Sequence, residues 1–296
     1  MNNIKVNTIA EKSYTKWQDY AMLVKLRLSL LVVFTSVIGY LIASNGAFSW
    51  THLIMLSVAG LLTSGAANAL NQTLEKDYDI HMARTQDRPV AAGRMKPSEA
   101  IMFAGLSCLV GISILALFNP LTAFLGMLSL ITYAFVYTPL KRYGTIAVAV
   151  GAIPGALPIL IGFTSFSGSI TFLALGLFAI QYLWQFPHFW SIGYLAFEDY
   201  KTAGYKLLPS ENGEIDKNIG LHAAIYAILI IPVAITLYIV EGGSIIPLMV
   251  TIILTITYTF LSLKMYTDQN RKSALYVMFG SFFYLPIVIL AYLVFL

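Results

Sequence analysis

Residues 28–46 read LSLLVVFTSVIGYLIASNG, an apolar run without a single charged side chain. A helix of this length can cross a bilayer, because a crossing takes about 20 apolar residues. Comparable stretches follow at 53–72, 100–118, 121–137, 145–164, 170–194, 220–240, 244–263 and 274–296. The sequence therefore predicts an all-α polytopic membrane protein with nine transmembrane helices.

The composition agrees with this fold class. Hydrophobic residues make up 58% of the 296-residue chain and charged residues only 11%, whereas a soluble domain carries about 25% charged residues. The length suits one helical bundle, so we expect a single transmembrane domain over residues 1–296. The net charge of +4 is no nucleic-acid signal, and the single cysteine, Cys108, excludes an intrachain disulfide.

The positive charges are distributed unevenly along the chain. All 18 lysines and arginines lie before the first predicted span or in the loops after spans two, four, six and eight. With nine spans, these segments share one side of the membrane. The positive-inside rule then places the N-terminus and these loops in the cytoplasm and the C-terminus outside. The expected location is the bacterial cytoplasmic (inner) membrane.

The segment after span two carries the most informative polar pattern. Asn71, Glu75 and Asp79 are four residues apart, so on a helix their oxygen-bearing side chains share one face. Such a row of hard oxygens suits Mg²⁺. Arg84 and Arg88 follow and can grip phosphate oxygens. The pattern indicates a diphosphate substrate with an apolar tail; the alternative is a solvated loop of alternating charges.

A second acidic segment follows span six. It contains Glu198, Asp199 and Lys201, and Asp199 could hold a second metal ion. Charges after a membrane span are common, so this segment carries less weight alone.

Basic and aromatic residues near two other spans are further candidates for a diphosphate pocket. They are Lys25, Arg27, Tyr137, Lys141 and Arg142. The alternative is that these cations only fix topology and reach toward the membrane surface.

The last candidate, His188, lies late in span six among four aromatic residues. A histidine inside a span needs a partner and can ligate a metal, bind a substrate or move a proton. The alternatives are an interfacial aromatic belt, or a histidine bonded to a backbone carbonyl that Pro187 leaves free.

The segment from Asn71 to Pro89 resembles the acidic motif of intramembrane prenyltransferases typified by the hydroxybenzoate polyprenyltransferases. Asn71, Asp79, Arg84 and Arg88 match that motif, and Glu75 stands where the family usually has aspartate. The motif does not identify the acceptor. The resemblance implies catalytic roles for these five residues and for Asp199, with Mg²⁺ on Asn71, Glu75, Asp79 and Asp199.

Three other segments look like the protohaem IX farnesyltransferases (haem O synthases). They are Phe186–Trp190, Asp199–Gly204 with Leu208-Pro209, and Tyr137–Arg142. The family usually has Lys-Pro-Arg where this chain has Lys25-Leu26-Arg27, and Pro-Met-Leu-Pro at residues 206–209. The resemblance implies nine helices around a central cavity open to the cytoplasm.

The same resemblance implies transfer of a farnesyl group from farnesyl diphosphate to a vinyl group of haem B. His188 is then expected to ligate the haem iron or to position the macrocycle. The implied protein partners are haem A synthase or cytochrome oxidase assembly proteins. Two alternatives stay open: a polyprenyltransferase acting on an aromatic quinone precursor, and a transporter that uses intramembrane acids.

Overall fold

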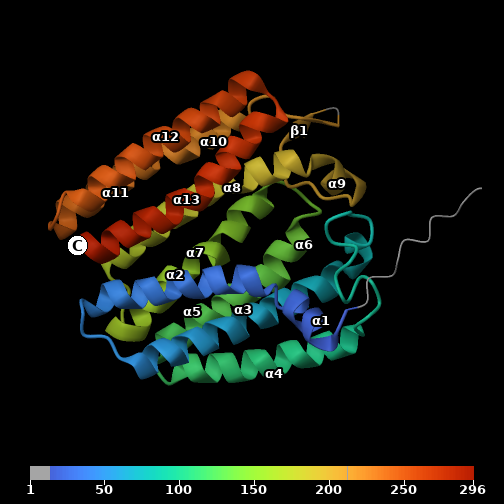
Figure 1. Ribbon diagram of the computed structural model, residues 1–296, viewed down its shortest axis with the longest axis horizontal. Coiled ribbons are helices and arrows are strands. Elements are labelled where there is room, and N and C mark those ends of the chain that lie inside the picture. Colours follow the sequence, from blue (N-terminus) through green and yellow to red (C-terminus); the bar gives the residue numbers. More distant parts are fainter. Residues whose placement is uncertain (1–13, 212) are drawn as a thin grey trace, which may run out of the picture.

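Helices that run side by side make up most of the molecule, in a computed structural model that describes residues 14–211 and 213–296 (Figure 1). The helices are α1 (Lys16–Leu23), α2 (Leu26–Ser44), α3 (Trp50–Asp79), α4 (Pro97–Ala116), α5 (Pro120–Ile131), the π-helix η1 (Thr132–Tyr137), α6 (Thr138–Leu140), α7 (Ile146–Ser167), α8 (Phe172–Leu195), α9 (Phe197–Thr202), α10 (Ile219–Ile228), α11 (Ile230–Glu241), α12 (Ile246–Asp268) and α13 (Arg271–Phe295). The strands β1 (Ser210–Glu211) and β2 (Glu214–Ile215) form a small antiparallel hairpin.

Eight helical segments of the described chain are long and apolar enough to cross a membrane. They are α2, α3, α4, α5 continued through η1 and α6, α7, α10 continued through α11, α12 and α13. The remaining predicted span, 170–194, corresponds to α8, which has 24 residues and packs along α7 and α13. Its apolarity is lower because it carries Gln181, Gln185 and His188, all of which face other helices.

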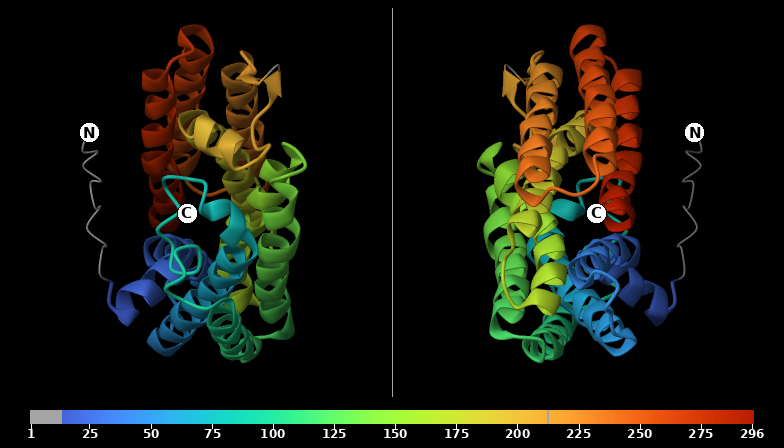
Figure 2. Two further views of the ribbon diagram at one scale, coloured as in Figure 1. Left: turned by 90° about the vertical axis from the view of Figure 1, so that its right-hand side faces the viewer. Right: turned by 90° about the vertical axis from the view of Figure 1, so that its left-hand side faces the viewer.

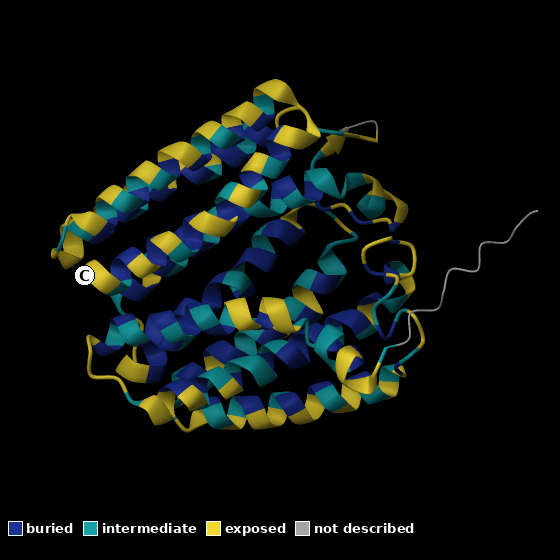
Figure 3. Cartoon of the chain, in the orientation of Figure 1, coloured by how far each residue is buried: buried dark blue, intermediate teal, exposed yellow. Residues whose placement is uncertain are grey.

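The outer surface of the bundle is apolar, as a lipid-facing surface must be. Figure 3 shows exposed residues along the outward sides of the helices and buried residues between them. On α4 the exposed side includes Met102, Leu106 and Leu109. Several buried residues, by contrast, are polar, among them Asn68 and Gln72 of α3. Exposed apolar residues on the outside and buried polar residues among the core residues support an integral membrane protein with a polar site inside the bundle.

Close packing of α2 against α7 fixes the centre of the bundle. A Cβ atom at Gly162 would lie 1.9 Å from the carbonyl oxygen of Ser36, and one at Gly39 would lie 2.6 Å from that of Ile159. Small residues at these positions let the two backbones approach each other. α7 continues unbroken through Pro154 and Pro158.

The basic segments gather at one end of the bundle. The loop after α3, the start of α7, α9 and the hairpin lie at the right-hand end in Figure 1, and Figure 2 (left) looks onto that end. The C-terminal end of α13 lies at the opposite end. This arrangement agrees with the prediction that the basic segments share one side of the membrane, while the predicted count of nine spans exceeds the eight candidate spans of the described chain. Lys5 and Lys12 lie outside the described residues.

One predicted boundary is wrong. The span predicted to end near residue 72 continues as α3 to Asp79. The extra turns are stable because their polar side chains are buried and paired: Gln72 donates hydrogen bonds from its amide to the carbonyl oxygens of Met22 and Leu23, at 2.8 and 3.1 Å. The acidic row therefore lies on a helix inside the protein, and the loop begins only at residue 80.

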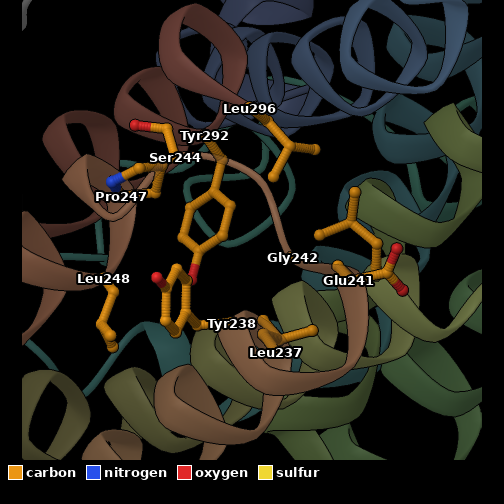
Figure 4. A pocket seen from close by; sticks show the side chains of 10 residues that line it. Leu237, Tyr238, Glu241, Gly242, Ser244, Pro247, Leu248, Tyr292 and Leu296 are labelled. Atoms are coloured by element: carbon orange, nitrogen blue, oxygen red, sulfur yellow. The ribbon is translucent and has the colours of Figure 1, made fainter.

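Two cavities lie near the ends of the bundle. One, of about 480 Å³, is open and is lined at the basic end by Gly144, Thr145, Lys206 and Asp216, among others. The other is a small pocket of about 10 Å³ beside Tyr238, Glu241 and Tyr292 near the opposite end (Figure 4). Neither is lined by the acidic row of α3, and the predicted central cavity stays a prediction.

Candidate active site

The acidic row forms the core of the site. Asn71, Glu75 and Asp79 occupy successive turns of α3, and their exposed fractions are 0%, 2% and 0%. Buried carboxylates are stable only when they are paired or bind a metal. The structure supplies paired cations from three other segments, so these oxygens are part of a charged cluster inside the protein.

Three basic residues hold the row. Arg88 places one guanidinium nitrogen 2.8 and 2.7 Å from the two carboxylate oxygens of Asp79, and 3.8 Å from Glu75. The ammonium of Lys141 lies 2.8 Å from Glu75 Oε1. Lys25 donates a hydrogen bond of 3.0 Å to Asn71 Oδ1. The loop after α3, the segment after α6 and the turn before α2 therefore meet at one row of oxygens.

The charges in this cluster do not balance. Three cations surround two carboxylates, which leaves a formal charge of +1. Burial, together with the positive charges of Arg88 and Lys141, lowers the pKa of Lys25 well below its usual value. Burial alone would also lower the pKa of Lys141, but the adjacent Glu75 carboxylate outweighs it and raises that pKa. When Lys25 is protonated, the cluster carries an excess positive charge, which suits it to bind an anion.

The backbone explains why Lys25 points inward and Arg27 does not. Lys25 has a φ of 48°, in the left-handed region, and forms the turn between α1 and α2. This strained conformation directs its side chain to Asn71. Arg27 follows on the first turn of α2, is exposed, and has no ion pair within the described part of the chain. Arg27 makes no hydrogen bond to the row among the described residues, and its predicted role in the pocket stays a prediction.

A ring of neutral side chains supports the row. Asn71 donates to Thr138 Oγ1 at 3.0 Å, and the Thr85 hydroxyl donates to the Asp79 carbonyl oxygen at 3.0 Å. The Lys141 ammonium lies over the Tyr137 ring, 4.7 Å from the centroid of that ring. These contacts fix the rotamers of the charged groups before any ligand binds.

Arg84 and Arg142 lie at the edge of the site. Arg84 donates a hydrogen bond of 3.1 Å to the Tyr200 hydroxyl on α9. The guanidinium of Arg142 stacks over Tyr78 at 3.9 Å and donates to the Leu74 carbonyl oxygen at 3.2 Å. Arg142 thus covers the end of α3, and Arg84 joins α9 to the loop that carries Arg88.

The side chains of the second acidic segment do not converge on the acidic row of α3. Asp199 is half-buried on α9, Glu198 is exposed, and Lys201 donates to the Gly213 carbonyl oxygen in the hairpin at 3.0 Å. Within residues 14–211 and 213–296, no three Asp, Glu, His or Cys side chains converge as one metal site. Asp199 therefore does not share one ion with Glu75 and Asp79 in this arrangement, and Lys201 serves the hairpin.

Tyr205 is a site residue that the sequence analysis missed. Its ring stacks on Tyr78 of α3, with centroids 5.8 Å apart, and lies edge-on to Tyr200 at 6.1 Å. Burial and the carboxylates of Glu75 and Asp79 raise its pKa. The only signal in the sequence was its position six residues after Asp199, and a lone tyrosine in a loop carries no pattern.

The His188 environment is built from α8 and α13. His188 Nδ1 lies 2.7 Å from Ser281 Oγ, and the imidazole stacks on Trp184 with a centroid distance of 4.9 Å. The rings of Phe189 and Phe282 also contact the imidazole, each with a centroid-to-centroid distance of 5.6 Å. The alternative of a bond to a carbonyl freed by Pro187 is wrong, because the partner of the ring is Ser281.

The tautomer of His188 follows from its partner. The Ser281 hydroxyl has one proton, which it donates to the Met278 carbonyl oxygen at 2.5 Å. With the proton used in this way, Ser281 accepts from His188, and this assignment places the imidazole proton on Nδ1 and the lone pair on Nε2. Nε2 has no hydrogen-bond partner among the described residues. This nitrogen is available to a metal or to a hydrogen-bond donor.

A membrane bundle with a buried row of acids and basic residues at one end agrees with the predicted binding of an anionic substrate with an apolar tail. The model of the UbiA prenyltransferase family matches residues 32–287. The chain belongs to this family, and the prediction of an intramembrane prenyltransferase is confirmed.

Individual proteins agree with this assignment. The protein named protoheme IX farnesyltransferase from Cytophaga hutchinsonii is 37% identical over 94% of this chain and 97% of its own length. The protein of that name from Flavobacterium johnsoniae is 35% identical over 99% of this chain and 98% of its own length. A UbiA homologue from Archaeoglobus fulgidus, solved with DMAPP and Mg²⁺, shares the fold with a TM-score of 0.70 over 92% of this chain and 99% of that one, at 15% identity.

Proposed function

We propose that this membrane prenyltransferase transfers the farnesyl group of farnesyl diphosphate to a vinyl group of haem B and so forms haem O. The identification of haem B as the acceptor rests on the nearly full-length similarity to proteins named protoheme IX farnesyltransferase. The observation that supports the donor is the buried row of Asn71, Glu75 and Asp79 with its surplus of positive charge.

The donor set fits Mg²⁺. Asn71, Glu75 and Asp79 offer hard oxygens on one helix face, the ligand chemistry that this ion prefers, and Mg²⁺ accompanies the prenyl diphosphate in the Archaeoglobus homologue. When bound, the ion would neutralise charge on the diphosphate. Asp199, half-buried on α9, is the residue available for a second ion. The residues that now pair with the carboxylates, Lys141 and Arg88, would then be free to bind phosphate oxygens.

The basic residues stabilise the leaving group. As the allylic C–O bond breaks, negative charge grows on the diphosphate, and Arg88, Lys141 and Lys25, which lie beside the acidic row, would bind its oxygens once the ion has taken over the carboxylates. Charges held in place in this way before the bond breaks lower the barrier. Arg84 closes the edge of the same site through Tyr200.

The acceptor step uses the electrons of a haem vinyl group. The vinyl carbon attacks the allylic carbon, a new C–C bond forms, and water captures the resulting cation and releases a proton to give a hydroxyethylfarnesyl group. The buried apolar interior limits early capture by water. His188 is the proposed contact to the haem, because its free Nε2 can bind iron and its aromatic surround suits a flat macrocycle.

The proposed location is the bacterial cytoplasmic membrane. The loops that carry the site are cytoplasmic in this proposal, and the C-terminus lies outside, since the described basic segments gather at one end of the bundle. The product would pass to haem A synthase or to cytochrome oxidase assembly proteins. A C-terminal reporter that is active only in the cytoplasm would contradict this orientation.

Acceptor-dependent release of pyrophosphate tests the function. Purified full-length protein is incubated with farnesyl diphosphate and Mg²⁺, with either haem B or 4-hydroxybenzoate as acceptor. We expect pyrophosphate release with haem B, and none after chelation of Mg²⁺. Release with 4-hydroxybenzoate alone would identify a quinone-precursor prenyltransferase, and no release under any condition would favour the transporter alternative.

A further inference from the structure

A second cluster of charged side chains joins α1 to the loop after α3, outside the acidic row. Arg94 donates hydrogen bonds from Nε to Asp19 Oδ1 at 2.9 Å and from one terminal nitrogen to Asp87 Oδ1 at 3.0 Å. Its other terminal nitrogen donates to the Asp87 carbonyl oxygen at 2.7 Å. The guanidinium also lies 4.4 Å from the centroid of the Tyr14 ring, and the Tyr14 hydroxyl donates to Asp87 Oδ2. All three nitrogens of the guanidinium are therefore used to connect two segments of the chain.

The helix that carries Asp19 is a firm support for Arg94. Asp19 is only 4% exposed, so its carboxylate is held inside the protein. The Gln72 side chain of α3 donates to the carbonyl oxygens of Met22 and Leu23 at the end of α1, at 2.8 and 3.1 Å. Because α1 is attached to α3 in this way, Asp19 holds Arg94 in a fixed place beside α3.

Arg94 in turn holds the residue that precedes Arg88. It binds both the carboxylate and the carbonyl oxygen of Asp87, and Arg88 follows directly in the chain. Arg88 then binds Asp79 of α3 at 2.8 and 2.7 Å. These contacts form a closed ring that leaves α3 at Gln72 and returns to it at Asp79. A lysine cannot take the place of Arg94 in this ring, because an ammonium lacks the planar fork of nitrogens.

The support becomes important when the partners at the acidic row are exchanged. In the proposed function the carboxylates of the row bind Mg²⁺, and Arg88 turns from Asp79 to a phosphate oxygen. Arg88 then loses its attachment to α3, while its loop, residues 80–96, consists of turns and bends rather than a helix. The hydrogen bonds of Arg94 do not involve the row, so they can hold the loop throughout this exchange.

We propose that Arg94 is a positioning residue for Arg88. Through Asp19 and Asp87 it holds the backbone of the loop, so that the Arg88 guanidinium stays in place to bind the diphosphate after it leaves Asp79. The inference rests on the proposed function, because it assumes a diphosphate at the acidic row. Arg94 does not touch the substrate and acts only through Arg88.

The test compares Arg94→Lys with the unaltered full-length protein. Lysine keeps the positive charge beside Asp19 and Asp87 but cannot maintain all three hydrogen bonds. The probe is inorganic pyrophosphate with saturating Mg²⁺, measured by calorimetry, and haem B is titrated in parallel. A misplacement of about 1 Å can cost about a hundredfold in turnover, so we expect pyrophosphate binding to weaken by about tenfold. Haem B affinity should stay unchanged.

A second background, Arg88→Gln, separates positioning from a general structural defect. Glutamine can still donate a hydrogen bond to Asp79, but no guanidinium remains to be positioned. In this background Arg94→Lys should weaken pyrophosphate binding by less than about twofold, because two residues that act through one contact are not additive. Asp19→Asn should show the same pattern with a smaller loss, since asparagine still accepts a hydrogen bond from Arg94. Losses of equal size in both backgrounds would overturn the inference.

Arg271→Lys is the matched control. It makes the same chemical change at the start of α13, where Arg271 donates a hydrogen bond of 3.2 Å to the Leu195 carbonyl oxygen, and pyrophosphate binding should be unaffected. Equal affinity of Arg94→Lys and the unaltered protein would contradict the positioning role, and so would a parallel loss of haem B affinity. Failure of the unaltered protein to bind pyrophosphate with Mg²⁺ would instead overturn the proposed function, and the inference with it.

Discussion

Replacement of Asp79 by asparagine keeps the shape of the side chain and removes one buried negative charge. Asp79 is 0% exposed and accepts hydrogen bonds of 2.8 and 2.7 Å from Arg88. A unit charge about 4 Å from another contributes about 4 kcal/mol at an effective dielectric of 20, which corresponds to about a thousandfold. We therefore expect Asp79→Asn to lower kcat/KM for farnesyl diphosphate by about three orders of magnitude at fixed Mg²⁺.

Asp77→Asn provides the matched control. The side chain of Asp77 is 80% exposed, and its only ion pair among the described residues is a contact of 3.9 Å with Lys76. The same chemical change two residues away should leave kcat/KM almost unaltered. The assay is farnesyl transfer to haem B, with circular dichroism and haem titration to verify folding. Near-normal turnover of Asp79→Asn, or equal losses in the two variants, would refute the role assigned to the acidic row.

Three further changes test other parts of the site. Glu75→Asp should retain substantial activity, because it keeps the charge at the row and restores the residue usual in the family; loss of activity comparable to that of Asp79→Asn would contradict this. Arg88→Lys should lower turnover by about tenfold or more, since one guanidinium nitrogen binds Asp79 and a lysine lacks the further nitrogens that could bind phosphate. Unchanged kinetics would contradict a role of Arg88 in binding the diphosphate. Ser281→Ala removes the hydrogen-bond partner of His188 and should weaken haem B binding by about fivefold, and His188→Ala should weaken it by more. Haem B binding is measured by Soret titration, and pyrophosphate binding should stay intact in both variants. Unchanged haem affinity with lost pyrophosphate binding would place His188 in the donor site.

The fold and the acidic row could be predicted because both are local patterns. Apolar runs of about 20 residues indicate spans, and the four-residue spacing of Asn71, Glu75 and Asp79 indicates one helix face. The boundary at residue 72 was misjudged for a physical reason. Polar residues normally end a span, but here Gln72 and its neighbours find partners within the bundle, so α3 continues to Asp79.

The pairings across the site could not be predicted, since they join segments far apart in the sequence. Lys141 and Arg142 are adjacent, yet only Lys141 reaches Glu75, while Arg142 stacks on Tyr78. Likewise, the partner of His188 is Ser281, 93 residues later. Tyr205 has no motif at all, and its stacking on Tyr78 beside the acidic row becomes visible only in the structure.

The central claim is farnesyl transfer to haem B at this site, and mass analysis of the haem tests it most directly. The full-length protein is incubated with haem B, farnesyl diphosphate and Mg²⁺, and the extracted haem is analysed by mass spectrometry. We predict a product heavier than haem B by one farnesyl and one hydroxyl group, present with the unaltered protein and absent with Asp79→Asn. Recovery of haem B with unchanged mass, from protein that binds both haem and pyrophosphate, would contradict the account.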